Sequence, residues 1–305
     1  MTVAIDLSVC EPVLIVGPAT VDVLSDARQA GGAVCYAARV ATALGVHAHV
    51  LTIAGDDADL GPLEGHTVAT VRSEHTLVYE HHLDGGTRRM RLLARPDRPL
   101  RATDLPPAWP APRTVLLAPL LPDDVDVGSF LDASTSAPPR EVGLLAQGLQ
   151  RVLDADGVVE ALGEPAAALT AAAQPDVSVF LSAEESAGWP DGALDALVGR
   201  ARRVVRTLGA AGAEVRDAAG LRRVPAAPAG AVVDPTGAGD VFATAFILAV
   251  SAGEHEIAGR LAAVCAAANV ERRGPAPLPP RAELEARASR LAGAAGDRGA
   301  QGDPS

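Results

Sequence analysis

The 305-residue sequence predicts an α/β fold, in which helices cover both faces of a mostly parallel sheet and a small β lid stands off this body. Short apolar runs of strand length alternate along the chain with segments of helical spacing, which is typical of a parallel sheet with helical crossovers. Aromatic residues make up only 3% of the chain, and the many alanines and valines suit close packing of helices on a sheet. Two alternating runs around a glycine turn predict the lid.

The N-terminal part of the body is predicted from three segments. The apolar run "PVLIVG" (12–17) ends in glycine and is typical of a buried parallel strand. The segment "AVCYAARVATALG" (33–45) has helical spacing and a glycine stop. A second strand follows in "HVLTIAGDD" (49–57), which ends in a polar turn.

The lid is predicted at about 68–95, around the hairpin "TLVYEHHLDGGTRRMRLL" (76–93). Its polar positions indicate that it stands off the body. His81 and His82 fall on opposite faces of a strand, and we expect them to be solvated lid histidines rather than joint ligands. An alternative for the lid arginines, that they clamp a phosphate on the substrate, stays open. These arginines are Arg88, Arg89 and Arg91.

Strands and helices continue to alternate in the C-terminal part. Strands are predicted in "TVLLAPL", "EVGLLAQG", "VSVFLS" and "RVVRTLG", and helices in "WPDGALDALVGRAR" and at 240–251, 254–269 and 280–292. We therefore predict one domain over residues 1–292. The glycine-rich, polar segment 293–305 is expected to be a disordered tail.

Composition excludes several classes of function. The net charge of −12 and pI near 5.0 disfavour nucleic acid and anionic membranes as partners. All 26 basic residues are arginine, which excludes Schiff-base chemistry and a Walker A loop because both need a lysine amine. The three cysteines have neither disulfide-framework nor zinc spacing, and no apolar run reaches membrane-spanning length. We expect a cytoplasmic protein.

The segment "VVDPTGAGDVFATAFILAV" (Val232–Val250) predicts a site for chemistry. A loop of small residues that leads into a helix exposes unpaired N–H groups at the positive end of the helix dipole, where an anion binds. Asp240, in the first turn, would stand beside a bound phosphate and could accept a proton from an attacking hydroxyl. The alternative, an aspartate that only caps the helix, stays open.

The string "DPTGAGD" resembles the C-terminal signature of the ribokinase, or PfkB, family of carbohydrate kinases. This resemblance implies a ribokinase-like three-layer αβα sandwich with a small β lid. It also implies that Asp240 is the catalytic base and that Gly237, Ala238 and Gly239 form an anion hole.

Other motifs follow the order of that family across roughly residues 12–292. "GPATVD" implies that Asp22 binds substrate hydroxyls, and "GGAVCYAARVATALG" implies that Gly31, Gly32 and Tyr36 line the substrate site. "IAGDDADLG" resembles a conserved turn of the family, and "VERRGPAPLP" the segment that closes its nucleotide site. The resemblance places nucleotide contacts at Thr207, Gly209, Gly212 and Thr236, in "VVRTLGAAG" and the "DPTGAGD" string.

Two positions depart from the family pattern. Tyr36 stands where the family usually has asparagine, which removes a familiar sugar contact. In "SAEE", Glu185 is kept but Ser182 replaces asparagine in the motif that organises Mg²⁺ through water. A capping box formed by the same two residues is the alternative. Asp234 matches a family position that helps to hold a monovalent cation such as K⁺, although turn geometry explains it as well.

The resemblance implies an ATP- and Mg²⁺-dependent kinase that phosphorylates a hydroxyl of a small sugar or cyclic polyol. An aromatic residue at position 36, "VDPTGAGD" and "LLAQGLQRVLDADG" (Leu144–Gly157) resemble plant-type myo-inositol kinases and related bacterial sugar kinases. A nucleoside or sugar-phosphate kinase, and a catalytically idle sugar sensor or scaffold, remain alternatives. A homodimer through the lid is a further expectation. No Gly-x-Gly-x-x-Gly follows the first strand, which disfavours a dinucleotide-binding oxidoreductase.

Overall fold

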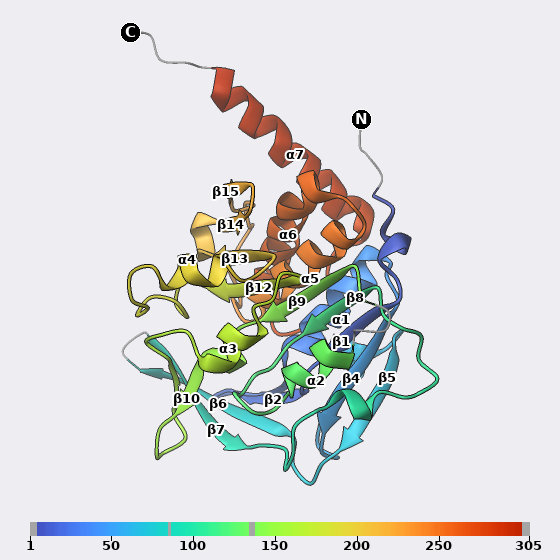
Figure 1. The fold of residues 1–305 in the computed structure, drawn as a ribbon, viewed down its shortest axis with the longest axis vertical. Coiled ribbons are helices and arrows are strands. Elements are labelled where there is room, and N and C mark those ends of the chain that lie inside the picture. Colours follow the sequence, from blue (N-terminus) through green and yellow to red (C-terminus); the bar gives the residue numbers. More distant parts are fainter. Residues whose placement is uncertain (1–4, 85–86, 134–137, 301–305) are drawn as a thin grey trace.

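The computed structural model describes residues 5–84, 87–133 and 138–300, with the backbone alone described at 83–84, 87–88 and 292–300. Its centre is a nine-stranded sheet in the order β15-β14-β13-β12-β9-β8-β1-β4-β5 (Figure 1). The pairs from β13 through β5 are parallel, and β14 and β15 add an antiparallel edge. These strands are β1 (Val13–Val16), β4 (Ala48–Ala54), β5 (Thr67–Arg72), β8 (Thr114–Leu117), β9 (Glu141–Leu145), β12 (Val177–Ser182), β13 (Arg203–Thr207), β14 (Ala213–Asp217) and β15 (Gly220–Val224).

Helices cover both faces of this sheet, so the predicted three layers are confirmed (Figure 1). One face carries α1 (Ala33–Leu44), α5 (Ala238–Ser251), α6 (His255–Val270) and α7 (Arg281–Ala300), and the other carries α2 (Val127–Ala133), α3 (Ala167–Ala172) and α4 (Ala193–Val198). Short 3-10 helices lie at Leu7–Cys10, Gly61–Leu63, Ala102–Asp104, Gly148–Gln150 and Gly209–Ala211.

The strand period of two divides the core into two clusters. In β1, Val13 and Ile15 point to the α1–α5 side, while Leu14 and Val16 point to the α2–α3 side. All four side chains are buried, which is why this strand reads as a continuous apolar run. The ends of β1 and of its parallel neighbours are thereby fixed beside the start of α5.

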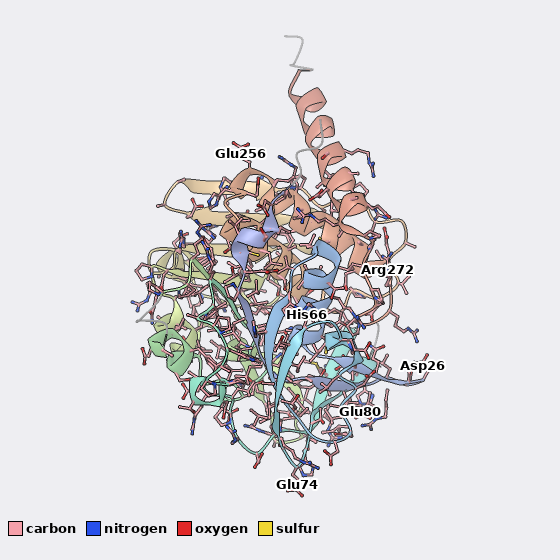
Figure 2. All side chains as sticks on the ribbon, turned by 90° about the vertical axis from the view of Figure 1, so that its right-hand side faces the viewer. Asp26, His66, Glu74, Glu80, Glu256 and Arg272 are labelled. Atoms are coloured by element: carbon pink, nitrogen blue, oxygen red, sulfur yellow. The ribbon has the colours of Figure 1, made fainter. Side chains whose placement is uncertain are left out.

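The lid is a second sheet, in the order β3-β2-β6-β7. Its strands are β2 (Thr20–Val23), β3 (Arg28–Gly31), β6 (Leu77–Asp84) and β7 (Thr87–Ala94). The predicted hairpin is therefore present, but the lid also recruits residues 20–31. Residues 67–72 belong to the main sheet instead, because β5 pairs in parallel with β4. The turn that carries Asp26 projects from the body at the lid side (Figure 2).

A small hairpin of β10 (Arg151–Leu153) and β11 (Val159–Ala161) lies beside the lid. The N–H of Leu92 in β7 donates to the carbonyl of Gly157 at 2.8 Å, and an isolated bridge joins Arg91 to Val158. The hairpin therefore ties the lid to the segment that follows β9.

Two helices differ in length from the predictions. The predicted helix at 189–202 is a short α4, because Pro190 and Gly192 delay its start and Gly199 ends it. Helix α7 passes residue 292, beyond which the sequence predicted a disordered tail, and reaches Ala300. Its alanines favour helix and no proline interrupts it. Residues 301–305 lie outside the described residues, and none of the described helices has the length and apolar character needed to cross a bilayer.

Candidate active site

At the N-terminus of α5, Gly237 packs against Tyr36, while Gly239 faces open space. Gly237 caps the helix with φ of 73°, a left-handed conformation that favours glycine, and a Cβ there would overlap the ring of Tyr36. Around Gly239, by contrast, a Cβ would meet no described atom within 4 Å apart from its chain neighbours and the backbone of its own helix. Glycine is therefore required at 237 by packing, while position 239 leaves space next to the first N–H groups of the helix.

Asp240 lies in the first turn of α5 and is half-buried. The pKa of its carboxyl is raised from 3.8 to about 7, mainly by burial and also by the charges of Glu185 and Asp22, while the charge of Arg151 lowers it. A carboxyl with this pKa exchanges a proton near neutral pH. Such a group suits a general base that must accept a proton and release it again.

Asp22 lies on β2 at the inner side of the lid. Its side chain is 7% exposed, accepts a hydrogen bond from the Thr20 hydroxyl at 3.2 Å, and has Oδ1 3.4 Å from Nε2 of His81. A Cβ on Gly31 would lie 2.5 Å from Oδ2 of Asp22. Gly32, with φ of 89°, would clash in the same way with the carbonyl of Pro18. Close internal packing thus accounts for both glycines, and their role in substrate binding stays a prediction.

The expectation of a solvated histidine is wrong for His81. Its side chain is 8% exposed and faces Asp22, whereas the side chain of His82 is 56% exposed and lies 2.7 Å from Glu80. Successive residues of β6 point to opposite faces, so His81 falls on the inner face of the lid. The alternation of the strand is visible in the sequence, but which of its faces turns inward is not.

Tyr36 packs against Gly237, at the start of α5. It is 2% exposed, and no hydrogen-bond partner for its hydroxyl lies among the described residues. Burial raises the pKa of the hydroxyl, and the nearby charges of Asp22, Asp234 and Asp240 raise it further. Tyr36 therefore stays neutral and supports Gly237 from behind, while its predicted contact with substrate remains a prediction.

Arg151 is a site residue that the sequence reasoning missed. Nη1 donates to the carbonyl of Leu120 at 2.8 Å, and the guanidinium lies over the ring of Tyr79 at 5.5 Å. Its charge lowers the pKa of both Asp240 and Glu185. A positive charge thus stands among the carboxylates of the site. The signal in the sequence that could have indicated this residue is a single arginine after the mostly apolar segment that begins "LLAQGLQRVLDADG".

Ser182 and Glu185 form the reciprocal bonds of a capping box. The N–H of Ser182 donates to Oε2 of Glu185 at 2.7 Å, and the N–H of Glu185 donates to the Ser182 hydroxyl at 3.1 Å. Burial raises the pKa of Glu185. The reciprocal bonds of the predicted alternative are therefore present, although they close a turn at 183–188 and not the start of a helix, and they hold the Glu185 carboxylate where its charge acts on Asp240.

A magnesium ion at this site would take most of its ligands from phosphate and water. Among the described residues, no group of three or more His, Cys, Asp or Glu side chains is placed to hold a metal. Mg²⁺ usually keeps several waters and binds proteins through one or two carboxylates. Glu185 and Asp240, whose negative charges repel each other, fit such an ion.

The predicted nucleotide residues divide into two kinds. Gly209 has φ of 56°, and a Cβ there would meet no described atom within 4 Å apart from its chain neighbours, so the loop after β13 is open there. A Cβ on Gly212, with φ of 96°, would overlap the backbone of Val224. Thr207 ends β13, and its carbonyl accepts from the N–H of Ala183 at 2.8 Å. These placements leave the nucleotide contacts as predictions.

Asp234 and Thr236 form the turn that precedes Gly237. Oδ1 of Asp234 accepts from the N–H and the hydroxyl of Thr236 at 3.0 and 2.5 Å. Oδ2 accepts from the N–H of Gly274 at 3.1 Å. The turn is thereby joined to the segment that follows α6.

Comparisons with known proteins agree with this geometry. The profile of the pfkB family carbohydrate kinases matches residues 161–281, which include Glu185 and Asp240. A comparison with curated proteins found no match. Among solved structures, a variant of a pyrophosphate-dependent myo-inositol-1 kinase, converted into a myo-inositol-3 kinase, is 20% identical with a TM-score of 0.70; the alignment covers 91% of this chain and 99% of that one.

Two further structures are similar. The Burkholderia thailandensis nucleoside kinase in complex with inosine is 20% identical, with a TM-score of 0.69 and coverage of 92% of this chain and 98% of that one. An Arabidopsis thaliana ribokinase complexed with ribose and ATP is 19% identical, with a TM-score of 0.64 and coverage of 91% and 98%. The family match and the fold confirm the predicted resemblance to the ribokinase, or PfkB, family and the predicted enzyme class, a phosphotransferase with a hydroxyl acceptor.

Proposed function

From the ribokinase-like fold and the PfkB resemblance, we propose that this chain transfers the γ-phosphoryl group of ATP to a hydroxyl of a small sugar or cyclic polyol, with Asp240 as the base. One observation carries the proposal: a carboxyl with a pKa of about 7 stands in the first turn of α5, beside the small-residue loop of Gly237 and Gly239. The arrangement supplies an anion site and a base at one place.

The chemistry requires one proton transfer and one displacement. Asp240 accepts the proton of the acceptor hydroxyl, and the oxygen forms a bond to the γ-phosphorus as the bond from phosphorus to the ADP oxygen breaks. A base with a pKa near 7 is ionised for part of the time at neutral pH and still accepts a proton readily. The N–H groups at the start of α5 would stabilise negative charge on the transferred group.

The other polar groups of the site would orient the reactants. Asp22, held by Thr20 and His81, would accept hydrogen bonds from acceptor hydroxyls. Arg151 would offset the negative charge that the donor brings among the carboxylates. A bound magnesium ion would supply further charge stabilisation, and Glu185 is the residue proposed to organise it.

The acceptor class is the finer part of this proposal. The similar structures include a myo-inositol kinase, a nucleoside kinase and a ribokinase, so acceptors rich in hydroxyls are common to them. The inositol kinase is pyrophosphate-dependent, and the donor is therefore also to be tested. A homodimer through the lid rests on the family resemblance, and sedimentation of the purified chain tests it.

The test is phosphate transfer from Mg-ATP or Mg-pyrophosphate across inositols, hexoses, pentoses, nucleosides and sugar phosphates. Asp240→Asn runs in parallel, and Asp195→Asn, at an exposed position of α4, is the matched control. The proposal expects acceptor-dependent transfer from ATP that collapses only in Asp240→Asn. Transfer from pyrophosphate alone would show that pyrophosphate, and not ATP, is the donor. Transfer to nucleosides or sugar phosphates alone would show that the acceptor is not a sugar or cyclic polyol. Sugar binding without transfer would support the idle sensor.

A further inference from the structure

Asp234 was predicted to help hold a monovalent cation, and its carboxylate oxygens already accept hydrogen bonds. Both carboxylate oxygens of Asp234 accept hydrogen bonds from the chain, from Thr236 and from the N–H of Gly274. The carbonyl of Thr236 accepts from Nδ2 of Asn269 at 2.9 Å. Each of these three oxygens therefore already faces an N–H or O–H donor.

Asn269 is unusual in this chain. It is the sole asparagine in 305 residues, it is 3% exposed, and it lies in the last turn of α6. A buried amide without partners costs free energy, so its position calls for a hydrogen-bonding reason. The bond to Thr236 supplies that reason and joins the end of α6 to the loop that enters α5.

The backbone of the same region adds a second tie. The N–H groups of Val233 and Asp234 both point to the carbonyl of Val270, at 2.7 and 3.2 Å. Residues 233–236 are thus held by 269 and 270 on one side and by Gly274 on the other. An ion at the turn would compete with these donors for the same oxygens.

An amide N–H and a cation act on a carbonyl in the same sense. Each places positive charge next to the oxygen and fixes the peptide plane that carries it. A side-chain amide achieves this without an ion that must first lose water. The residues present therefore do not fit a cation site that depends on the carbonyl of Thr236.

We propose that Asn269 takes the place of a monovalent cation beneath the anion-hole loop, so that the geometry of Gly237–Asp240 is independent of K⁺. Asn269 is then a positioning residue. This inference rests on the proposed kinase function only for its effect on rate, because the absence of cation binding is a property of the ligand-free protein.

The test measures thermal unfolding of the ligand-free chain in KCl, NaCl and choline chloride at equal ionic strength. The wild-type midpoints in KCl and choline chloride are expected to coincide. A saturable stabilisation by K⁺ over choline would overturn the proposal, whatever the activity of the protein. This arm needs no variant, so it remains decisive if a variant fails to fold.

A second arm uses Asn269→Ala, with Gln150→Ala as its matched control. Gln150 is also a fully buried amide that donates to a carbonyl, that of Glu164 at 3.1 Å. Both variants are expected to lose stability, but only Asn269→Ala should gain a K⁺-specific rise in midpoint. If phosphate transfer is established, its rate in choline should fall by about tenfold in this variant and recover in K⁺. Equal cation responses of the two variants would count against the proposal.

Discussion

The guanidinium of Arg151 lies 5.5 Å from the centroid of the Tyr79 ring, and the two side chains share the carbonyl of Leu120 as a hydrogen-bond acceptor. This pairing fixes a positive charge on the short strand β10, next to the lid. Since that charge lowers the pKa of Asp240, it sets the pH range in which the base is ionised.

Replacement of Arg151 by glutamine is therefore expected to raise the pKa of Asp240 above about 7. The base would be ionised over a smaller part of the neutral range, and the acidic limb of the kcat profile should move to higher pH. Glu185→Gln removes a negative charge and should move the pKa of Asp240 downward. NMR titration of Asp240 in both variants measures the two directions, and shifts of the same sign would contradict this account of the site.

His81 and His82 provide a matched pair on one strand. His81→Ala removes the partner of Asp22 at the inner face of the lid, and we expect KM for the acceptor to rise by about tenfold because the Asp22 carboxylate loses its fixed position. His82→Ala changes only the exposed outer face and should leave KM unchanged. Steady-state kinetics with the acceptor found in the substrate panel decides between them. Equal effects would place His81 outside the acceptor site.

Gly237 and Gly239 should separate stability from activity. Gly237→Ala imposes a side chain at φ of 73° against Tyr36, and we expect a loss of roughly 1–3 kcal/mol in the free energy of unfolding. The methyl group of Gly239→Ala would enter open space beside its own helix, so stability should hold. Its methyl group would occupy the space in front of α5, and transfer should fall. Denaturant unfolding and transfer rates together give the contrast. A stable Gly237→Ala would refute the packing argument.

Stability should also depend on the ionisation of Asp240. Its pKa is raised to about 7 in the fold from an ordinary value of 3.8, so the unfolded chain ionises first as pH rises. The fold therefore loses stability between about pH 4 and pH 7. Asp240→Asn removes this cost, and the variant should exceed the wild type by roughly 1–4 kcal/mol at pH 8. Urea unfolding at pH 4 and pH 8 measures the difference, which should vanish at the lower pH.

The sequence predicted the body of this fold because its signals are local. Buried parallel strands leave apolar runs, as in Val13–Val16, and Gly45 ends α1 in a left-handed conformation that the helical spacing anticipates. The loop before Asp240 was likewise predictable, because a loop of small residues ahead of a helix commonly binds an anion. These features depend on residues that are neighbours in the chain.

Other features depend on distant pairing, which sequence patterns do not contain. Residues 20–31 join the lid only because β2 pairs with β6. Arg151 matters because its short strand lies beside Tyr79, which is far away in the sequence. His81 is buried because the inner face of β6 turns toward Asp22. Only the alternation at His81 and His82 was predicted, whereas the strands at 20–31 and 151–153 were not, because their pairing partners lie far away in the chain.

The segment after α6 touches both halves of the site. Gly274 donates to the carboxylate of Asp234, a Cβ on this glycine would lie 3.3 Å from the side chain of Gln29 in β3, and Arg273 pairs with Asp26 of the lid at 3.2 Å. Any movement of the lid would therefore displace the turn that leads into α5 or break these contacts. Acceptor and donor would then influence each other's affinity through Arg273 and Gly274 as well as at the point of transfer.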